Sequence, residues 1–406
     1  MVHQFENVTD PFWNSCLGSL ARPGASEFVA NGPDSFFVTY MGKKERIPGP
    51  GMNLRSYIES IKSNIVPLVH SEIPFDENGY IFEGHYKAKD STGAAFEGRC
   101  HIALPPISEV PYITMTKIAS TSSTIESIAE SGSMSTEMLQ FIIAAVRAKL
   151  TIVLSGQSGA GKTTTLQALT KYFDEQDRVA VAEDIPELKL TQGNVTYLHT
   201  LPPRPGLDSS LVADLSFVVK QWLRMRQDRG IIGETRGKEF ADFLIAANAG
   251  LKGSLTTIHA NDPAGALDKM TRFALAGSDR QPMRSINKEI GSAVDLVIQL
   301  SRVDGKHRMT HIEEITDTVG NAEDARLSSE TLYEYNAEDD TWKKAGMLSD
   351  NLRKKLTAAG IDLKPFLATT VGATMRKHQS ASSQNPNINR GGEFGGGNPF
   401  GSGRSI

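Results

Sequence analysis

The hydrophobic and polar residues of this 406-residue chain follow different periods in different segments. Over residues 25–118, short runs of alternating apolar and polar residues predict strands, and one run with apolar residues three or four positions apart predicts a helix. Strands around one helix indicate a small α+β domain, preceded by an N-terminal extension at residues 1–24. The expected strands cover residues 28–31, 36–40, 80–87 and 99–104, and the expected helix covers residues 54–68.

A polar segment rich in Ser and Thr at residues 119–133 predicts a linker. Over residues 134–375, helical and strand periods alternate, which favours a parallel sheet whose strands are joined by helices. Residues 376–406, rich in Gly, Ser and Asn, predict a disordered tail. The expected helices of the α/β domain cover residues 136–149, 162–173, 214–226, 238–248, 263–275 and 349–359, and its expected strands cover residues 150–154, 179–182, 230–233, 254–258, 294–302 and 308–315.

Glycine positions refine these expectations. Gly230 interrupts the apolar run that precedes Glu234, so we expect a short strand there. Asp304-Gly305, between the two expected strands that follow, is a strong hairpin signal, and residues 337–340 predict a second hairpin.

Composition narrows the class of protein. A formal net charge of -4 with 39% hydrophobic residues is ordinary for a soluble globular protein and gives no overall attraction to nucleic acid. Cys16 and Cys100 lie far apart and lack metal-ligand spacing, so a reducing cytosol fits. Neither a signal peptide nor a membrane-spanning apolar run is evident. We expect a cytoplasmic protein whose membrane association is peripheral, through a partner.

The clearest chemistry lies in one turn between an expected strand and an expected helix. It reads Gly156-Gln157-Ser158-Gly159-Ala160-Gly161-Lys162-Thr163, followed by Thr164, which is the spacing of a phosphate-binding loop. Glycines let backbone N–H groups turn toward a polyanion, and the start of the helix adds partial positive charge. Lys162 is placed to reach the β- and γ-phosphates, and Thr163 to ligate Mg²⁺. We therefore predict a nucleotide site.

Two other expected strands end at acidic residues. The strand at 179–182 runs into Glu183-Asp184-Ile185-Pro186-Glu187, and the strand at 230–233 runs into Glu234. At such strand ends a carboxylate can hold Mg²⁺ through water or act on the water that attacks a γ-phosphate. Glu234 is our candidate for activating water or ordering the metal shell. The alternatives are a solvated acidic turn at Glu183 and an ordinary strand-end glutamate at Glu234.

Basic residues surround these positions. His259 ends a third expected strand, where it is placed to sense a γ-phosphate or to bond an acidic residue, and a structural histidine is the alternative. Four arginines crowd the segment around Glu234 and are candidates for binding polyphosphate, although at least two are expected on a solvated basic face. They are Arg224, Arg226, Arg229 and Arg236.

These clusters, in this order, resemble the Walker A, Asp, Walker B and His boxes of the secretion and pilus traffic ATPases. Arg236-Gly237 and Ile258-His259-Ala260-Asn261 are most similar to the hexameric ATPase of type IV secretion and conjugation. The resemblance spans about residues 25–335. It implies a RecA-like parallel-sheet core behind a PAS-like α+β domain, with ATP bound at the domain and subunit junction. It also implies Mg²⁺ held by Thr163 and, through water, by Glu183 and Glu234.

The resemblance further implies a ring of six subunits in which arginines act in trans, with Arg99 and Arg204 the candidates by position. Such a ring would be an ATP-driven motor at the cytoplasmic face of the inner membrane. Its partners would be channel or coupling proteins, without direct nucleic-acid binding. A pilus-assembly, pilus-retraction or type II secretion motor is one alternative, and an ATP-regulated docking ring is another.

Overall fold

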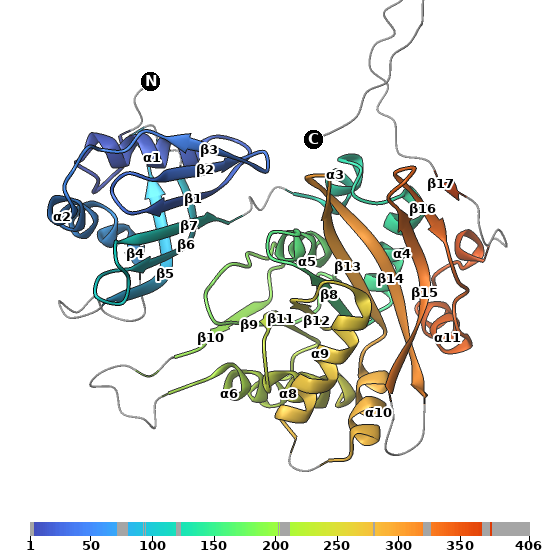
Figure 1. Cartoon of the computed structure of the whole chain (residues 1–406). Coiled ribbons are helices and arrows are strands. Elements are labelled where there is room, and N and C mark those ends of the chain that lie inside the picture. The colour runs from blue at the N-terminus through green and yellow to red at the C-terminus, as the bar shows by residue number, and fades with distance from the viewer. Residues whose placement is uncertain are drawn as a thin grey trace, which may run out of the picture.

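The chain folds around two β-sheets, one in each of two lobes (Figure 1). The computed structural model describes residues 4–70, 80–91, 93, 95–118, 123–201, 203, 212–278, 281–319, 326–367 and 374–375. The predicted tail at residues 376–406 lies outside these ranges.

The first lobe is an antiparallel sheet that carries two helices. Its strands, in spatial order, are β3 (Lys43–Ile47), β2 (Phe36–Tyr40), β1 (Ala25–Asn31), β7 (Tyr112–Lys117), β6 (Ala95–Ala103), β5 (Ile81–Lys89) and β4 (Val69–His70). The helices are α1 (Pro11–Ala21) and α2 (Leu54–Asn64), with a 3-10 turn, η1 (Val66–Leu68), after α2. This lobe contains the strands and the helix expected for residues 25–118, together with β3, β4 and β7, which the sequence pattern did not indicate.

Helix α1 lies in segment 1–24, which the sequence pattern indicates as an extension. Asp10 caps the helix by accepting a backbone N–H hydrogen bond, and Pro11 occupies its first position. Trp13 is fully buried in the same core as the strands, and its ring stacks on that of Tyr57 of α2 with centroids 5.9 Å apart. The segment therefore completes the core of the first lobe, and the expectation of a separate extension does not match this packing.

The second lobe is built on a sheet that is parallel on one side and antiparallel on the other. Its parallel strands, in spatial order, are β10 (Val195–His199), β9 (Val179–Glu183), β11 (Arg229–Thr235), β12 (Leu255–Ile258), β8 (Ile152–Gly156) and β13 (Leu296–Val303). Four antiparallel strands continue it, namely β14 (Lys306–Val319), β15 (Arg326–Asn336), β16 (Thr341–Lys344) and β17 (Thr374–Met375). The predicted α/β fold class is confirmed.

Helices cover both faces of this sheet (Figure 1). Because successive side chains of a strand point to opposite faces, Ile152 and Leu154 of β8 join one core and Val153 joins the other. The first core includes α3 (Ile125–Glu130), α4 (Thr136–Arg147), α5 (Lys162–Thr170), α11 (Asp350–Ala358) and η3 (Lys364–Phe366). The second includes α6 (Leu215–Lys220), α7 (Trp222–Met225), α8 (Glu239–Asn248), α9 (Pro263–Ala276) and α10 (Met283–Ala293). With both faces covered, the strand ends are the accessible parts of the sheet.

Some elements differ from the sequence prediction. Helix α3 lies in the expected linker at 119–133, where Thr124 and Ser127 form a capping box. The expected helix at 214–226 is divided into α6 and α7. Helix α10 and strand β10 have no counterpart among the expected elements. Helices α3, α6 and α7 and strand β10 are short, and a hydrophobic period is a weak signal for short elements. Helix α10 is different, because its buried Ile286 and Ile290 lie four residues apart, which is a helical spacing.

Gly230 lies inside β11 and does not shorten it. A Cβ atom at Gly230 would lie 2.3 Å from the fully buried Trp222 ring, so glycine is needed where the indole packs on the strand. Strand β11 runs over 7 residues, and the expectation of a short strand is wrong.

A buried ion pair lies at the amino-terminal edge of the parallel strands. Arg229, whose side chain is 1% exposed, places Nε 2.6 Å from Asp177 Oδ2, and Lys149 Nζ lies 2.6 Å from Asp177 Oδ1. The Arg229 guanidinium also lies 4.1 Å from the centroid of the Phe173 ring. Burial opposes ionisation of Asp177, but hydrogen bonds from Lys149 and Arg229 outweigh it and lower the pKa of the Asp177 carboxyl.

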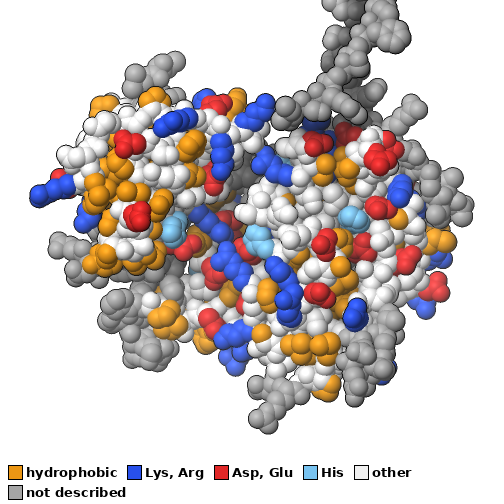
Figure 2. Space-filling model, in the orientation of Figure 1, with side chains coloured by type: hydrophobic (Ala, Val, Ile, Leu, Met, Phe, Trp, Pro, Cys, Tyr) orange, Lys and Arg blue, Asp and Glu red, His pale blue; other side chains and the backbone are white. Residues whose placement is uncertain are grey.

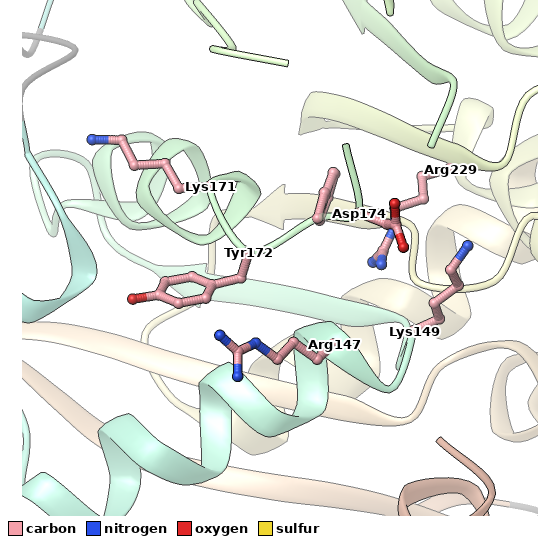
Figure 3. Close-up of a pocket in the computed structure, with 7 residues that line it drawn as sticks. Arg147, Lys149, Lys171, Tyr172, Asp174 and Arg229 are labelled. Atoms are coloured by element: carbon pink, nitrogen blue, oxygen red, sulfur yellow. The ribbon is translucent and has the colours of Figure 1, made fainter. Parts of the chain in front are cut away.

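Figure 3 shows a pocket of about 420 Å³ at this edge. The residues labelled there are Arg147, Lys149, Lys171, Tyr172, Asp174 and Arg229. Arg229 therefore stabilises the fold at the end of β11 opposite to Glu234, and it is not one of the arginines near the predicted nucleotide site.

We expect Asp177→Asn to lower the free energy of unfolding by about 3–5 kcal/mol, because the buried Arg229 charge would lose its partner. Urea unfolding followed by circular dichroism measures this change. Glu175→Gln, at an exposed position in the same loop, is the matched control and should change the free energy by less than about 0.5 kcal/mol. Equal values for the two variants would contradict the role assigned to Asp177.

Candidate active site

The phosphate-loop sequence forms the turn between β8 and α5. Gly156 ends the strand at a place where a Cβ atom would lie 2.4 Å from the Leu300 carbonyl oxygen of β13. Gly159 and Gly161 have φ angles of 71° and 92°, which favour glycine. The loop is exposed over residues 157–159, so a ligand can reach it from solvent.

Polar side chains continue from this loop into its surroundings. Thr163 and Thr164 lie in the first turn of α5 and are partly buried. Gln157 Nε2 donates a hydrogen bond to Asn261 Oδ1 over 3.3 Å, which ties the loop to the segment that follows β12. The loop and the end of β12 therefore form one surface.

Lys162 is buried and folded back onto the loop. Its Nζ donates to the Gly156 carbonyl over 2.9 Å and to the Gln157 carbonyl over 3.0 Å, and it lies 3.4 Å from His259 Nδ1. Burial lowers the pKa of Lys162 to about 8, although the nearby Glu234 carboxylate acts in the opposite direction. The ammonium group thus stands where the loop turns, with its charge only partly compensated.

Glu234, at the end of β11, lies between two cationic or hydrogen-bonding partners. Its Oε1 is 2.7 Å from His259 Nε2, and its Oε2 is 2.8 Å from the Arg236 guanidinium. Burial opposes ionisation, but hydrogen bonds from His259 and Arg236 lower the pKa of Glu234 to about 2. In the tautomer whose Nε2–H donates to this carboxylate, Nδ1 of His259 can accept from Lys162. A continuous chain of contacts therefore joins Lys162, His259, Glu234 and Arg236.

Glu183, at the end of β9, is a buried carboxyl with one oxygen in use. Its Oε1 accepts the backbone N–H groups of Glu187 and Leu188 over 3.1 and 3.0 Å, while Oε2 is buried without a hydrogen-bond partner. A Cβ atom at Gly233 would lie 3.0 Å from Glu183 Cγ, so glycine leaves room for this side chain. Burial raises the pKa of Glu183 to about 8.

The first lobe reaches this group of residues through β6. Arg99 forms an ion pair with Glu187, and Glu97 forms one with Lys189. Burial raises the pKa of Glu187, and Arg99 acts against that rise. Charged side chains of both signs, together with histidines, gather where the two lobes meet (Figure 2). Arg99 is thus near the site, but its partner belongs to the same chain.

The other arginines named from the sequence are not brought together. Of those around Glu234, Arg236 reaches its carboxylate, whereas Arg224 and Arg226 are exposed on or just after α7. Arg204 lies outside the described residues. Of the four arginines around Glu234, Arg236 is therefore at the site and Arg229 is buried at the opposite edge of the sheet. The other two are exposed to solvent.

Two further basic residues lie beside the loop without any signal in the sequence. Lys269 of α9 donates from Nζ to the His259 carbonyl oxygen, and His307 of β14 lies 3.1 Å from the Ala160 carbonyl oxygen through Nδ1. Both are single basic residues on elements far from the loop in sequence, without a motif of their own. Only the packing of α9 and β14 brings them to the site.

No group of three or more His, Cys, Asp or Glu side chains in the described ranges is arranged to hold a metal ion. No helix within the same ranges is both long and apolar enough to cross a membrane.

We expect Glu183→Gln to flatten the pH dependence of stability. With its pKa raised to about 8, the folded chain keeps a proton on Glu183 that the unfolded chain has released. The folded state binds more protons, so the free energy of unfolding falls by up to about 1.4 kcal/mol per pH unit as the pH rises from about 5 to 8. Gln loses this proton but keeps an oxygen acceptor. Urea unfolding at several pH values measures both slopes, and parallel slopes would contradict the raised pKa.

Comparison with known proteins agrees with the resemblance seen in the motifs. The conjugal transfer protein TrbB of Rhizobium radiobacter is 32% identical over 254 residues, which are 61% of this chain and 68% of that protein. The type IV secretion system protein VirB11 of Bartonella quintana is 31% identical over 181 residues, 43% of this chain and 49% of that protein.

A solved structure shows the same fold. The ATPase DotB of Legionella pneumophila has a TM-score of 0.54 at 15% identity, covering 87% of this chain and 90% of that one. A model of the type II/IV secretion system proteins matches residues 19–338, which include both sheets almost completely. The chain belongs to the family of type II/IV secretion system proteins.

Proposed function

We propose that this chain hydrolyses ATP and that hydrolysis powers type IV secretion or conjugative transfer. The observation that carries the proposal is the chain of contacts from Lys162 through His259 and Glu234 to Arg236, beside the phosphate loop. Family membership, and relatives named for conjugal transfer and type IV secretion, support the transport part of the proposal.

The loop supplies the binding site for the polyphosphate. Backbone N–H groups of residues 159–163 and the Lys162 ammonium would hold the β- and γ-phosphates. Lys162 now donates to two loop carbonyls, and phosphate oxygens would replace these acceptors. A polyanion favours the charged form of Lys162, whose pKa burial has lowered to about 8.

Glu234 would orient the attacking water without removing its proton early. A carboxylate whose pKa is about 2 is a weak base but a good hydrogen-bond acceptor. His259 links this carboxylate to Lys162, so a change at the phosphate side alters the hydrogen bonds of Glu234. Arg236 would neutralise charge that develops on the transferred phosphoryl group.

The site residues fit a hydrated divalent cation. Mg²⁺ neutralises phosphate charge when bound, and it retains water ligands that carboxylates can hold. The Thr163 hydroxyl would ligate it, while Glu183 and Glu234 would accept hydrogen bonds from its waters. The buried Oε2 of Glu183, which has no hydrogen-bond partner, would be the acceptor in the ionised form of this carboxyl, which a nearby dication favours over the protonated form.

The proposed working form is a ring of six subunits. It would lie at the cytoplasmic face of the inner membrane, held there by channel or coupling proteins. A net charge of -4 supports the absence of direct nucleic-acid binding. Arg99 pairs with Glu187 of its own chain, so we assign it a role within the subunit and keep Arg204 as the arginine that acts across the interface.

We expect Lys162→Ala to abolish ATP binding and hydrolysis. Lys162 supplies the buried ammonium group of the phosphate loop, all of whose residues the structure describes, and the variant would lose it. Glu234→Gln should bind ATP normally but turn over about 10²-fold more slowly, because an amide would hold the attacking water in a different orientation. Calorimetric binding and phosphate release measure the two effects. Lys252→Ala, at an exposed position, is the control.

A transport assay decides between a motor and a docking ring. Full transport by the Glu234→Gln variant would reject the motor.

Mixed rings test the assignment of the arginines. When Lys162→Ala subunits are mixed with Arg204→Ala subunits, about a quarter of the sites should regain hydrolysis if Arg204 acts on its neighbour's nucleotide. Mixing with Arg99→Ala should restore none. Phosphate release is measured on hexamers isolated by size, and recovery with Arg99→Ala would overturn the role within the subunit. A fully active monomer would remove the shared site altogether.

A further inference from the structure

The hairpin of β13 and β14 brings a histidine against the phosphate loop. Asp304 and Gly305, with φ angles of 50° and 76°, form its turn, and the resulting register places Arg302 opposite His307. Strand β13 is the parallel neighbour of β8, from which the loop begins, with Leu300 paired to Gly156. The tip of the hairpin therefore extends beside the loop.

His307 makes direct contact there. Its Nδ1 lies 3.1 Å from the Ala160 carbonyl oxygen, and a Cβ atom at Gly161 would lie 3.5 Å from the same nitrogen. Because a carbonyl can only accept, Nδ1 carries the hydrogen. Partial burial of the ring lowers the pKa of His307, so the donor is a neutral imidazole at physiological pH.

The base of the hairpin is held firmly. Arg308, the residue after His307, is 2% exposed and donates from Nε and a terminal nitrogen to the two carboxylate oxygens of Asp340, over 3.0 and 3.3 Å. Its guanidinium also lies 5.9 Å from the centroid of the Trp342 ring. His307 is thus carried by a rigid strand, which suits a side chain that fixes another segment.

We propose that His307 is a positioning residue of the nucleotide site, which holds the phosphate loop in its binding conformation through the Ala160 carbonyl. The inference rests on the proposed binding of ATP at this loop. The peptide unit of the Ala160 carbonyl also carries the Gly161 N–H, one of the donors expected to face the phosphates. A hydrogen bond to the carbonyl polarises that unit and strengthens its N–H as a donor. A loop ordered before binding also loses less conformational entropy when the nucleotide binds.

The test compares three replacements of His307 in the whole 406-residue chain. His307→Ala and His307→Phe should raise the Kd and KM for ATP roughly three- to tenfold, which is the expected effect of losing one hydrogen bond, with kcat within about twofold. His307→Asn places an amide N–H near the position of Nδ1 and should restore both constants to within about twofold. His307→Phe keeps a ring of similar size, so it separates the donor from packing. Lys306→Ala, at the neighbouring exposed position, is the matched control.

Calorimetry with ATP, steady-state phosphate release and thermal unfolding are measured on each protein. A Kd unchanged in His307→Ala and His307→Phe would overturn the proposal, as would failure of His307→Asn to bind more tightly than His307→Phe. An effect on kcat alone would also overturn it, because a positioning role in binding must appear in the Kd. If the unmodified protein does not bind ATP, the proposed function fails instead, and the two failures are therefore distinct.

Discussion

The parallel pairing of β9, β11, β12 and β8 is the constraint on which the site depends. Parallel strands end at the same edge of a sheet, so a residue that follows each strand meets those that follow its neighbours. Glu183, Glu234, His259 and Gly156 end or follow these four strands. No local interaction among them is needed to bring them together, because the register of the backbone hydrogen bonds does so. The parallel register of the sheet therefore places the candidate site residues side by side.

The two edges of the parallel strands differ in how fully their charged and polar groups are paired. At the amino-terminal edge the Asp177 carboxylate binds both Lys149 and Arg229, so the charges of this cluster compensate one another. At the carboxyl-terminal edge one oxygen of Glu183 is buried without a hydrogen-bond partner and a buried Lys162 is held mainly by carbonyls. Unsatisfied polar groups are costly in a folded chain and persist where a ligand will use them. The first edge stabilises the sheet, and the second leaves polar groups available to a ligand.

Whether a feature of this structure can be predicted from the sequence depends on how far apart in the chain the interacting residues lie. The loop and the strand-end positions of Glu183, Glu234 and His259 are visible in the sequence, because they depend on neighbours within a few residues. The structural role of Arg229 is not, since it is decided by Asp177, 52 residues away. Helix α1 carries buried apolar residues at helical spacing, so the helix itself could be predicted, but its packing on Tyr57 of α2 depends on residues far along the chain. The contacts of Arg99 with Glu187 and of His307 with Ala160 depend on the packing of separate elements, which no local pattern encodes.

The contact between Arg99 and Glu187 links the position of the first lobe to that of Glu183. Two backbone N–H groups, those of Glu187 and Leu188, hold the carboxyl of Glu183, and the side chain of Glu187 is held in turn by the first lobe. The angle between the two lobes therefore influences where Glu183 stands relative to the phosphate loop. In the ring that we propose, a subunit whose first lobe is turned by its neighbours would hydrolyse ATP at a different moment from one whose lobe is not. The order in which the subunits of such a ring act would then be set mechanically, without any change in the residues proposed to bind the nucleotide.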